Sequence, residues 1–372
     1  MQKKHRKHAK LTLKNNGEFG PNELSFVGVK CSVISGMVAE ISKRLADKYK
    51  TVYVDASHGK DNTAPVFDTY TFHASGDTHI ATNLEMNKFN DRIHFAPYDL
   101  ICVNGNHFPA SKQIVFLDAE KENSIAKRID QLGDIQFFIR VSAELEPFDC
   151  LIEKDANIRE LPIYDITDVA AIANHIEKIT HASVAGLDGL VLVGGKSTRM
   201  GTDKAQLEYY GVPQSDYAVQ LIEAEGLQTY LSVRNNQNLD NPNTISDAFV
   251  GLGPFGAICS AFMKNPNRAY LVLATDLPYV NKELIQLLLS KRNPKKIATA
   301  IKGKEAKFME PLITIWEPKS YPILLNYLSQ GYSCPRKILI NSDVEIVEVE
   351  DSLIRNVNTP DEFTQVKKEI GS

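Results

Sequence analysis

The chain has few cysteines, and none of them in the patterns of disulfide-rich or zinc-binding proteins. Its 372 residues include five cysteines, an odd number, widely scattered and without a C-x-x-C pair. Such usage indicates neither a disulfide framework nor a structural zinc site. The nine histidines have no cysteine or carboxylate cluster beside them at metal-ligand spacing, so the sequence carries no signal for a transition-metal site.

Long apolar runs and a strong net charge are also missing. No run approaches about 18 apolar residues, and the basic N-terminus MQKKHRKHAK is not followed by the apolar segment of a signal peptide. With 42 basic and 46 acidic residues, the net charge of −4 favours neither nucleic acid nor an anionic membrane surface as a partner. We expect a soluble, cytoplasmic protein with a solvated N-terminal tail.

A chain of this length is expected to form two domains, since about 100–200 residues per domain is usual. Apolar residues make up 43% of the sequence, which is enough for ordinary hydrophobic cores. The small and polar stretch THASVAG at 180–186 is the expected linker. The predicted domains are therefore residues 1–181 and residues 187–372.

The first half of the chain alternates between strand and helix patterns, which predicts an α/β domain with a mostly parallel sheet. The predicted strands are 24–29, 51–55, 100–103, 113–117 and 137–141, and the predicted helices are 36–49 and 169–179.

The loop after the first predicted strand nearly matches a phosphate-binding sequence. Residues 28–35 have the length and the ends of G-x-x-x-x-G-K-[ST], but Val33 and Ile34 stand where the second glycine and the lysine belong. A β-branched residue disfavours the required turn, and loss of the lysine removes the cation that contacts the phosphates. A coincidental match in an ordinary strand-to-helix loop explains the sequence equally well.

The order of these elements resembles the GTP-binding adaptor family of molybdopterin-guanine dinucleotide biosynthesis. The segment LPIYDITDV, which begins at Leu161, looks like the close of that family's domain. The resemblance implies a second α/β domain with a P-loop-like fold. Because its Walker A loop is not intact, we expect a degenerate docking or scaffolding domain that does not bind GTP tightly.

The second half repeats the alternation and predicts a doubly wound α/β sheet, whose ligands bind at the carboxyl ends of the strands. The predicted strands are 189–193, 228–233, 243–245, 269–274 and 297–301, and the predicted helices are 216–225, 256–263 and 281–290.

The stretch LDGLVLVGGKSTRMGTDKAQL at 187–207 is the strongest functional signal in the chain. Gly194 and Gly195 stop an apolar strand, and Lys196, Arg199 and Lys204 follow in a loop of small or flexible residues. Glycines let backbone N–H groups approach phosphate oxygens, and the cations neutralise their charge. The glycine spacing matches neither a Walker A loop nor the Rossmann fingerprint. An ordinary glycine-rich turn with its cations in solvent is the alternative.

A carboxylate follows the predicted strand 269–274. Asp276 stands at the strand end, where an acidic residue beside bound phosphates is the usual way to hold Mg²⁺. The alternative is that it caps the helix starting near Asn281.

Three further features lie at predicted strand ends or helix starts. A second glycine-rich turn at 251–258 follows Asp247, and Glu310 precedes an apolar strand. Near the C-terminus, NVNTPDE at 356–362 indicates an N-capped helix, with Thr359 or Asn358 as the cap and Pro360 at the first helical position.

Together these features resemble the molybdenum cofactor guanylyltransferases, over essentially all of residues 187–372. The matching motifs are GGxSxRMGxDK, G-P-[LF]-G, the D-x-P-Y strand end and N-V-N-T-P. The resemblance implies a three-layer α/β/α Rossmann-like nucleotidyltransferase domain that is MobA-like.

The resemblance also implies roles for individual residues. Arg199, Lys204 and Asp276 would be catalytic, with Asp276 holding Mg²⁺, and Asn356 and Asn358 would face the metal or the pterin phosphate. The implied nucleotide-binding residues are Leu192, Val193, Gly194, Gly195, Lys204, Ser232, Asp247, Gly253 and Asp276.

Two positions depart from the family pattern. Val193 replaces the more usual alanine beside the base. Ser232 stands where relatives often carry asparagine, so Arg234 or Asn235 is an alternative nucleotide contact.

The implied reaction is attack by the terminal phosphate of molybdopterin, with or without molybdenum, on the α-phosphate of GTP, which releases pyrophosphate. Mg²⁺ is the expected cofactor, and proteins of molybdenum insertion or molybdoenzyme maturation are the expected partners. Cytidylyl transfer to the same pterin, sugar-1-phosphate nucleotidyl transfer, and a non-enzymatic molybdopterin-binding adaptor remain alternatives.

Overall fold

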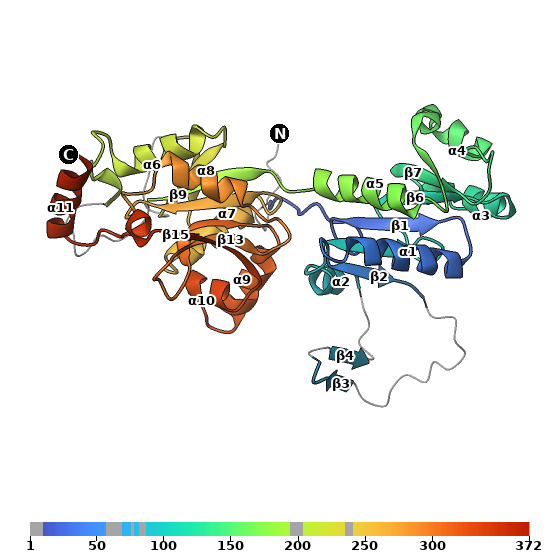
Figure 1. Ribbon diagram of the computed structural model, residues 1–372, viewed down its shortest axis with the longest axis horizontal. Helices are drawn as coiled ribbons and strands as arrows, with labels where there is room; N and C mark the ends of the chain where they lie inside the picture. Colours follow the sequence, from blue (N-terminus) through green and yellow to red (C-terminus); the bar gives the residue numbers. More distant parts are fainter. Residues whose placement is uncertain are drawn as a thin grey trace, which may run out of the picture. The chain divides into compact units, whose positions relative to one another are not determined.

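The computed structural model describes residues 10–56, 69–75, 78–81, 87–193, 204–234 and 241–371. The described chain forms two compact units, each a sheet flanked by helices (Figure 1). The first spans Asn16–Ser183, and the second runs from Val184 onward together with the N-terminal residues through Asn15. None of the helices in these described ranges has the length and apolar content needed to cross a membrane.

The N-terminal residues that precede Asn16 pack with the second unit. The Asn15 N–H donates to Asn267 Oδ1 at 2.6 Å, and Asn267 Nδ2 donates to the Leu13 carbonyl at 2.9 Å. Burial and the nearby charge of Lys319 lower the pKa of Lys14. Most of residues 10–15 are nonetheless exposed, and the predicted solvated tail stays a prediction because residues 1–9 lie outside the described ranges.

The first unit contains a six-stranded parallel sheet in the order β2-β5-β1-β6-β7-β8, as its alternating sequence pattern predicts. The strands are β1 (Glu23–Val27), β2 (Thr51–Val54), β5 (Leu100–Asn104), β6 (Lys112–Leu117), β7 (Ile135–Arg140) and β8 (Ile163–Asp165). An antiparallel hairpin of β3 (Thr69–Phe72) and β4 (Thr78–Ala81), which the sequence analysis did not predict, stands apart from this sheet.

Helices cover both faces of the six-stranded sheet because its central strands alternate apolar side chains between the faces. On β6, Ile114 and Phe116 pack with α1 (Cys31–Leu45) and α5 (Val169–Ala182), whereas Val115 and Leu117 pack on the opposite face. The helices of that face are α3 (Glu122–Ala126) and α4 (Asp149–Lys154), and Phe95, directly after α2 (Lys88–His94), packs in the cluster that contains Ile101 and Val103 of β5.

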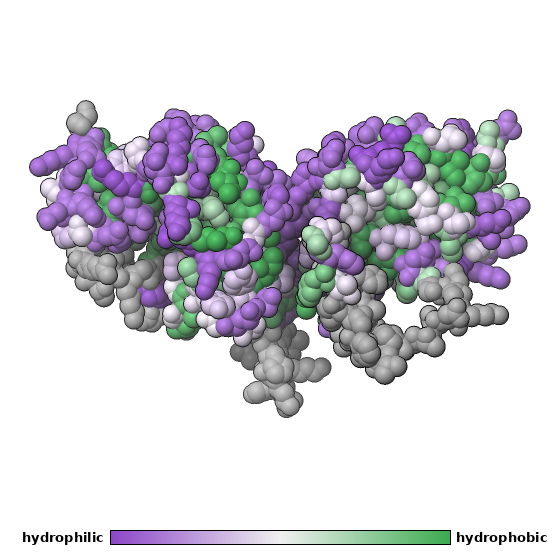
Figure 2. Space-filling view, turned by 60° about the horizontal axis from the view of Figure 1, so that its bottom comes forward, coloured by the Kyte–Doolittle hydropathy of each residue, from purple (hydrophilic) through white to green (hydrophobic). Residues whose placement is uncertain are grey.

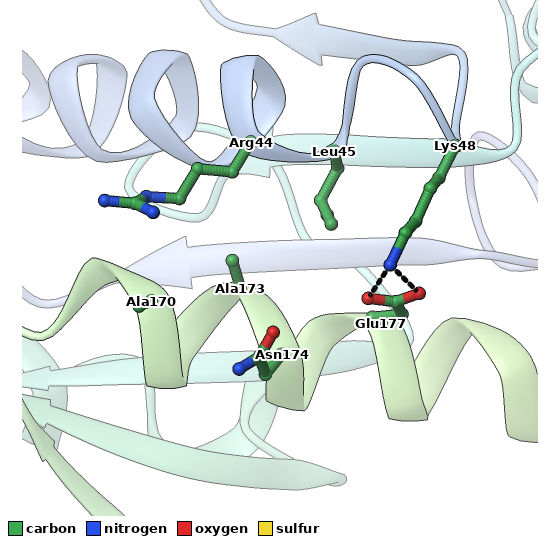
Figure 3. Close-up of a pocket in the computed structure, with 7 residues that line it drawn as sticks. All are labelled: Arg44, Leu45, Lys48, Ala170, Ala173, Asn174 and Glu177. Atoms are coloured by element: carbon green, nitrogen blue, oxygen red, sulfur yellow. Dashed lines mark hydrogen bonds and ion pairs between the residues drawn. The ribbon is translucent and has the colours of Figure 1, made fainter.

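A shallow groove runs between α1 and α5 (Figure 3). Its floor includes Leu45 and Ala173, and Lys48 Nζ donates to both carboxylate oxygens of Glu177 at 2.8 and 2.9 Å. This ion pair joins the turn after α1 to the C-terminal half of α5 at the surface, where such a pair contributes little stability.

Helix α1 begins earlier than the sequence suggested. We expected a loop at 28–35 and a helix from Gly36, but α1 starts at Cys31, only three residues after β1. The reason is that Ile34 is fully buried and continues the apolar stripe of Val38 and Ile41, so this turn gains core contacts by being helical. The short connection leaves no room for a loop of Walker A length.

The second unit contains a seven-stranded mixed sheet in the order β11-β10-β9-β12-β14-β13-β15. Strand β14 runs antiparallel to both neighbours, a reversal that the sequence analysis did not predict. The strands are β9 (Leu187–Leu192), β10 (Thr229–Val233), β11 (Thr244–Ser246), β12 (Ala269–Ala274), β13 (Ala298–Gly303), β14 (Glu310–Trp316) and β15 (Val344–Val349).

Helices on both faces of this sheet complete the predicted three-layer α/β/α arrangement. One face packs against α6 (Gln214–Glu223) and α8 (Lys282–Ser290). The other face packs against α7 (Pro254–Lys264), α9 (Ser320–Ser329) and α10 (Pro335–Ile340). Hydrophilic side chains cover much of each unit on the face drawn in Figure 2, with apolar side chains between them.

The strand order places the candidate site. Strand β9 is paired in parallel with β10 on one side and with β12 on the other, and Leu192 at the end of β9 is opposite Ala274 at the end of β12. The chain order reverses at β9, which makes this pair of strand ends a topological switch point. The segments that follow Leu192 and Ala274 therefore leave the sheet side by side.

Candidate functional site

Lys204, Asp276 and Asn358 meet beside the carboxyl ends of β9 and β12. Lys204 opens the short 3₁₀ helix Lys204–Gln206, and its Nζ donates to Asn358 Oδ1 at 2.7 Å. The same Nζ lies 3.5 Å from Asp276 Oδ2, and the two side chains are 20% and 25% exposed. Three of the residues expected at the site thus come together in a partly solvated position that a ligand can reach.

Asp276 has one carboxylate oxygen without a hydrogen-bond partner among the described residues. This oxygen, Oδ1, is buried, whereas Oδ2 faces Lys204. A buried acceptor without a partner is costly unless a donor or a cation completes it. The Asp276 carbonyl accepts from the Val357 N–H at 2.9 Å, which holds the segment carrying Asn358 against the end of β12.

A second carboxylate, Glu310, lies close enough to Asp276 for their charges to interact. Burial raises the pKa of Glu310, and the negative charge of Asp276 adds to this, against the lowering effects of the Leu312 N–H and of Arg336. Arg336 Nη2 donates to Glu310 Oε2 at 3.3 Å. The sequence indicated Glu310 as a landmark, but it carried no signal for Arg336, which comes from a helix that we did not predict.

The oxygen donors at this position suit a hard divalent cation. Mg²⁺ is commonly bound by one or two carboxylates, with phosphate oxygens and water completing its shell. Asp276 Oδ1 is available as one carboxylate ligand, and Glu310 is a second carboxylate nearby. Within the described ranges, no group of three or more His, Cys, Asp or Glu side chains forms a closed metal cage. The arrangement is therefore that of an open site.

The segment that carries Asn358 is anchored on both sides. Thr359 is the N-cap of α11 (Pro360–Ile370) in a capping box with Glu362, and Pro360 occupies the first helical position as predicted. The Asn358 N–H donates to Glu362 Oε2 at 2.7 Å, and this bond is the main cause of the lowered pKa of Glu362. Asn356 is exposed two residues earlier.

A cluster of three polar side chains holds the C-terminal end of α11. Arg355 Nη2 donates to Glu369 Oε2 at 2.6 Å and to the Tyr279 hydroxyl, which in turn donates to Glu369. Tyr279 follows Asp276 by three residues, so the cluster ties the end of β12 to α11. The sequence analysis missed it because its members come from three separate segments.

The glycine-rich turn before α7 is held by Asp247. Its Oδ1 accepts from Ser260 Oγ at 3.0 Å and from the Phe249 N–H at 2.9 Å. Gly253, with φ of +58°, is the N-cap of α7, a conformation that strongly favours glycine. The structure thus shows Asp247 as a support of the turn, while its proposed contact with a nucleotide stays a prediction.

The remaining nucleotide-binding candidates lie around the end of β9. Leu192 is half-buried at its last position, and the Val193 N–H donates to the carbonyl of Ser232 at 3.1 Å. Ser232 is itself buried on β10, so its backbone rather than its side chain is tied to Val193. Outside the described residues lie Gly194, Gly195, Lys196, Arg199 and Asn235.

Comparison with known proteins bears on the second unit. Residues 189–345 match the family model of the MobA-like NTP transferase domain. The matched residues include the ends of β9 and β12 as well as Lys204 and Asp276.

Two curated relatives match about half of this chain. The molybdenum cofactor biosynthesis bifunctional protein of Synechocystis is 32% identical over 185 residues, which cover 48% of this chain and 53% of that protein. The probable molybdenum cofactor guanylyltransferase of Flavobacterium johnsoniae is 27% identical, and the match covers 48% of this chain and 96% of that protein. The chain thus spans about half the length of the first relative and nearly all of the second.

Solved structures are similar to parts of this chain. Molybdopterin-guanine dinucleotide biosynthesis protein A from Archaeoglobus fulgidus aligns with 22% identity and a TM-score of 0.42, over 50% of this chain and 98% of that chain. A molybdopterin-guanine biosynthesis protein B aligns with 15% identity and a TM-score of 0.31, over 43% of this chain and 99% of that chain.

Proposed function

We propose that this protein transfers GMP from GTP to molybdopterin, with or without bound molybdenum, to form molybdopterin guanine dinucleotide and pyrophosphate. The observation that carries the proposal is the convergence of Lys204, Asn358 and Asp276 at the switch point of a MobA-like domain. The names of the Flavobacterium relative and of similar Shewanella proteins support guanylyl transfer.

Charge neutralisation is the main task of the site, because both reactants are anionic. Lys204 carries a charge that is held in place by Asn358, so it can contact phosphate oxygens without reorganising. Arg199 is proposed to act on the leaving pyrophosphate from the loop that precedes Lys204. Asn358, and Asn356 two residues before it, are proposed to face the pterin phosphate, since Asn358 contacts Lys204 beside the strand ends.

Asp276, with Glu310 nearby, is proposed to hold Mg²⁺. A bound Mg²⁺ would polarise phosphate oxygens and neutralise their charge. The residues of the chain then have a separate role, which is to orient the two phosphates for in-line attack. The unsatisfied Asp276 Oδ1 supports this assignment, because cation binding would satisfy it.

The nucleotide contacts are proposed to follow the end of β9 and the turn before α7. Leu192, Val193 and Ser232 border the strand end, and Gly253 leaves its backbone open to close approach. The first unit is proposed to be a docking or scaffolding domain for proteins of molybdenum insertion or molybdoenzyme maturation. Its short β1–α1 connection supports weak GTP affinity.

The decisive experiment is pyrophosphate release by the purified full-length protein with Mg²⁺, molybdopterin and either GTP or CTP. We expect release with GTP that depends on molybdopterin and is much weaker with CTP. A preference for CTP would indicate cytidylyl transfer instead. Pyrophosphate release with a sugar 1-phosphate in place of molybdopterin would indicate sugar-1-phosphate nucleotidyl transfer. Molybdopterin binding without any pyrophosphate release would support an adaptor.

A further inference from the structure

A nucleophile, a base and a carboxylate meet in the first unit, at the carboxyl ends of three neighbouring strands. Cys31 is the first residue of α1 after β1, Asp55 follows β2, and His107 follows β5. In the sheet, β5 lies between β2 and β1. Cys31 therefore lies within the stretch 28–35 that nearly matches a phosphate-binding sequence.

The cluster converges on one ring nitrogen. Cys31 Sγ lies 3.2 Å from His107 Nε2, and Asp55 Oδ1 lies 3.8 Å from the same nitrogen. A proton on Nε2 therefore faces both the sulfur and the carboxylate. In this geometry His107 can take the proton of the Cys31 thiol on Nε2, on the side of the ring that also faces Asp55.

Buried and partly buried groups hold the carboxylate in place. Asn104, which is fully buried, donates from Nδ2 to Asp55 Oδ1 at 2.8 Å, and the Tyr53 hydroxyl donates to Asp55 Oδ2 at 2.8 Å. Burial acts to raise the pKa of Asp55, but these hydrogen bonds and one from the Ala56 N–H outweigh it and lower the pKa. Asp55 is therefore ionised beside His107 at neutral pH.

Besides Asp55, cations also lie near Cys31 in the chain or are linked to it through Asn106. Lys30 is exposed and precedes it as the N-cap of α1, with no side-chain capping bond and no acidic residue in the first helical turn. Arg128 Nη2 donates to the Asn106 carbonyl at 3.2 Å, and Asn106 Nδ2 lies 3.7 Å from Cys31 Sγ. A helix N-terminus and nearby cations both stabilise a thiolate and attract an anionic reactant.

The other four cysteines lack this environment. Burial raises the pKa of Cys102 and of Cys259 to about 12, and it also raises the pKa of Cys150. Cys334 is exposed and is the N-cap of α10, but in the described ranges it makes no contact with a histidine. Cys334 can therefore serve as the internal control for thiol reactivity, since it is more exposed than the half-buried Cys31.

We propose that Cys31 is a reactive thiol that forms a mixed disulfide with small anionic disulfides, a covalent site separate from nucleotidyl transfer. The Cys31 thiolate attacks one sulfur of a disulfide R–S–S–R, so that a Cys31–S–S–R bond forms and the R–S–S–R bond breaks. The departing R–S⁻ takes the proton from His107 Nε2. The Cys31 sulfur is oxidised and the departing sulfur is reduced, so no further oxidant is needed.

The test uses the reduced full-length protein and oxidised glutathione at neutral pH, with modification at each cysteine followed by peptide mass spectrometry. We expect Cys31 to react about tenfold faster than Cys334, despite its lower exposure, because more of it is thiolate. Neutral iodoacetamide on the same protein should show the same order. Reaction at Cys31 that is equal to or slower than that at Cys334 with both reagents would overturn the proposal.

His107→Asn tests the role of the base. It should remove most of the rate advantage of Cys31, lower the thiolate ultraviolet absorbance and leave the rate at Cys334 unchanged, while Cys31→Ser abolishes the mixed disulfide in the first unit. An unchanged Cys31 rate in folded His107→Asn would contradict the assignment. If that variant does not fold, the wild-type comparison of Cys31 with Cys334 decides the matter.

Discussion

Lys204 Nζ lies 2.7 Å from Asn358 Oδ1, although the two residues are 154 positions apart in the chain. The contact exists because the Val357 N–H donates to the Asp276 carbonyl at the end of β12, which brings the start of α11 beside the end of β9. A charge held in this way is preorganised for phosphate, and the predictions below depend on it.

Replacing Lys204 by alanine should reduce turnover by about 10²–10³, because one preorganised charge contact to the reacting phosphates is lost. The steady-state rate of pyrophosphate release measures this, with thermal unfolding to show that the fold is retained. Lys302→Ala, which removes a lysine paired with Glu348 on the outer strands, is the matched control and should keep its activity. Near-normal turnover of Lys204→Ala would refute the role.

Asp276→Asn should weaken binding of the divalent cation in the presence of GTP and lower turnover by at least about 10², since the variant keeps its size but loses its charge. Titration with Mn²⁺, followed by its electron paramagnetic resonance signal, measures cation affinity directly. Asp343→Asn, at a surface pair with Lys296, is the control. Unchanged Mn²⁺ affinity in Asp276→Asn would place the cation elsewhere.

Glu310→Gln should change how stability depends on pH. Burial raises the pKa of Glu310 in the folded protein, so between its unfolded and folded pKa values the folded state binds more protons than the unfolded state. Stability contributed by this group is therefore present at low pH and is lost as the pH rises through the folded pKa.

Denaturant unfolding at several pH values should show the stability of Glu310→Gln rising relative to wild type as the pH increases through that window. Glu348→Gln, which is exposed, should show no such trend, and an identical trend in both variants would argue against a buried Glu310.

Thr359→Ala should reduce the free energy of unfolding of the second unit by about 1 kcal/mol, because it removes the N-cap of α11. It should also lower turnover, since the capping box holds the backbone of Asn358 through Glu362. Urea denaturation and the rate of pyrophosphate release test the two effects. Thr364→Ala in the same helix removes only a hydroxyl that donates to the Pro360 carbonyl, so it should leave both quantities nearly unchanged. Equal effects of the two variants would show that the cap has no special role.

Local sequence patterns determined much of the architecture. The apolar run at 269–274 is the strand β12 with the same bounds, and the alternation of strands and helices predicted two α/β units with largely parallel pairing. The types of residue in the loop after β9 and at the end of β12 also indicated Lys204 and Asp276. These features follow from periodicity and from side-chain chemistry, which act over a few residues along the chain.

The tertiary structure alone decided which distant segments meet. The early start of α1 at Cys31, the reversal of β14 and the position of Arg336 depend on packing against elements far away in the sequence. The same holds for Lys204 with Asn358, and for Cys31 with His107. Strand order determines these neighbours, and strand order results from burying whole sheet faces, so no short window of sequence contains it.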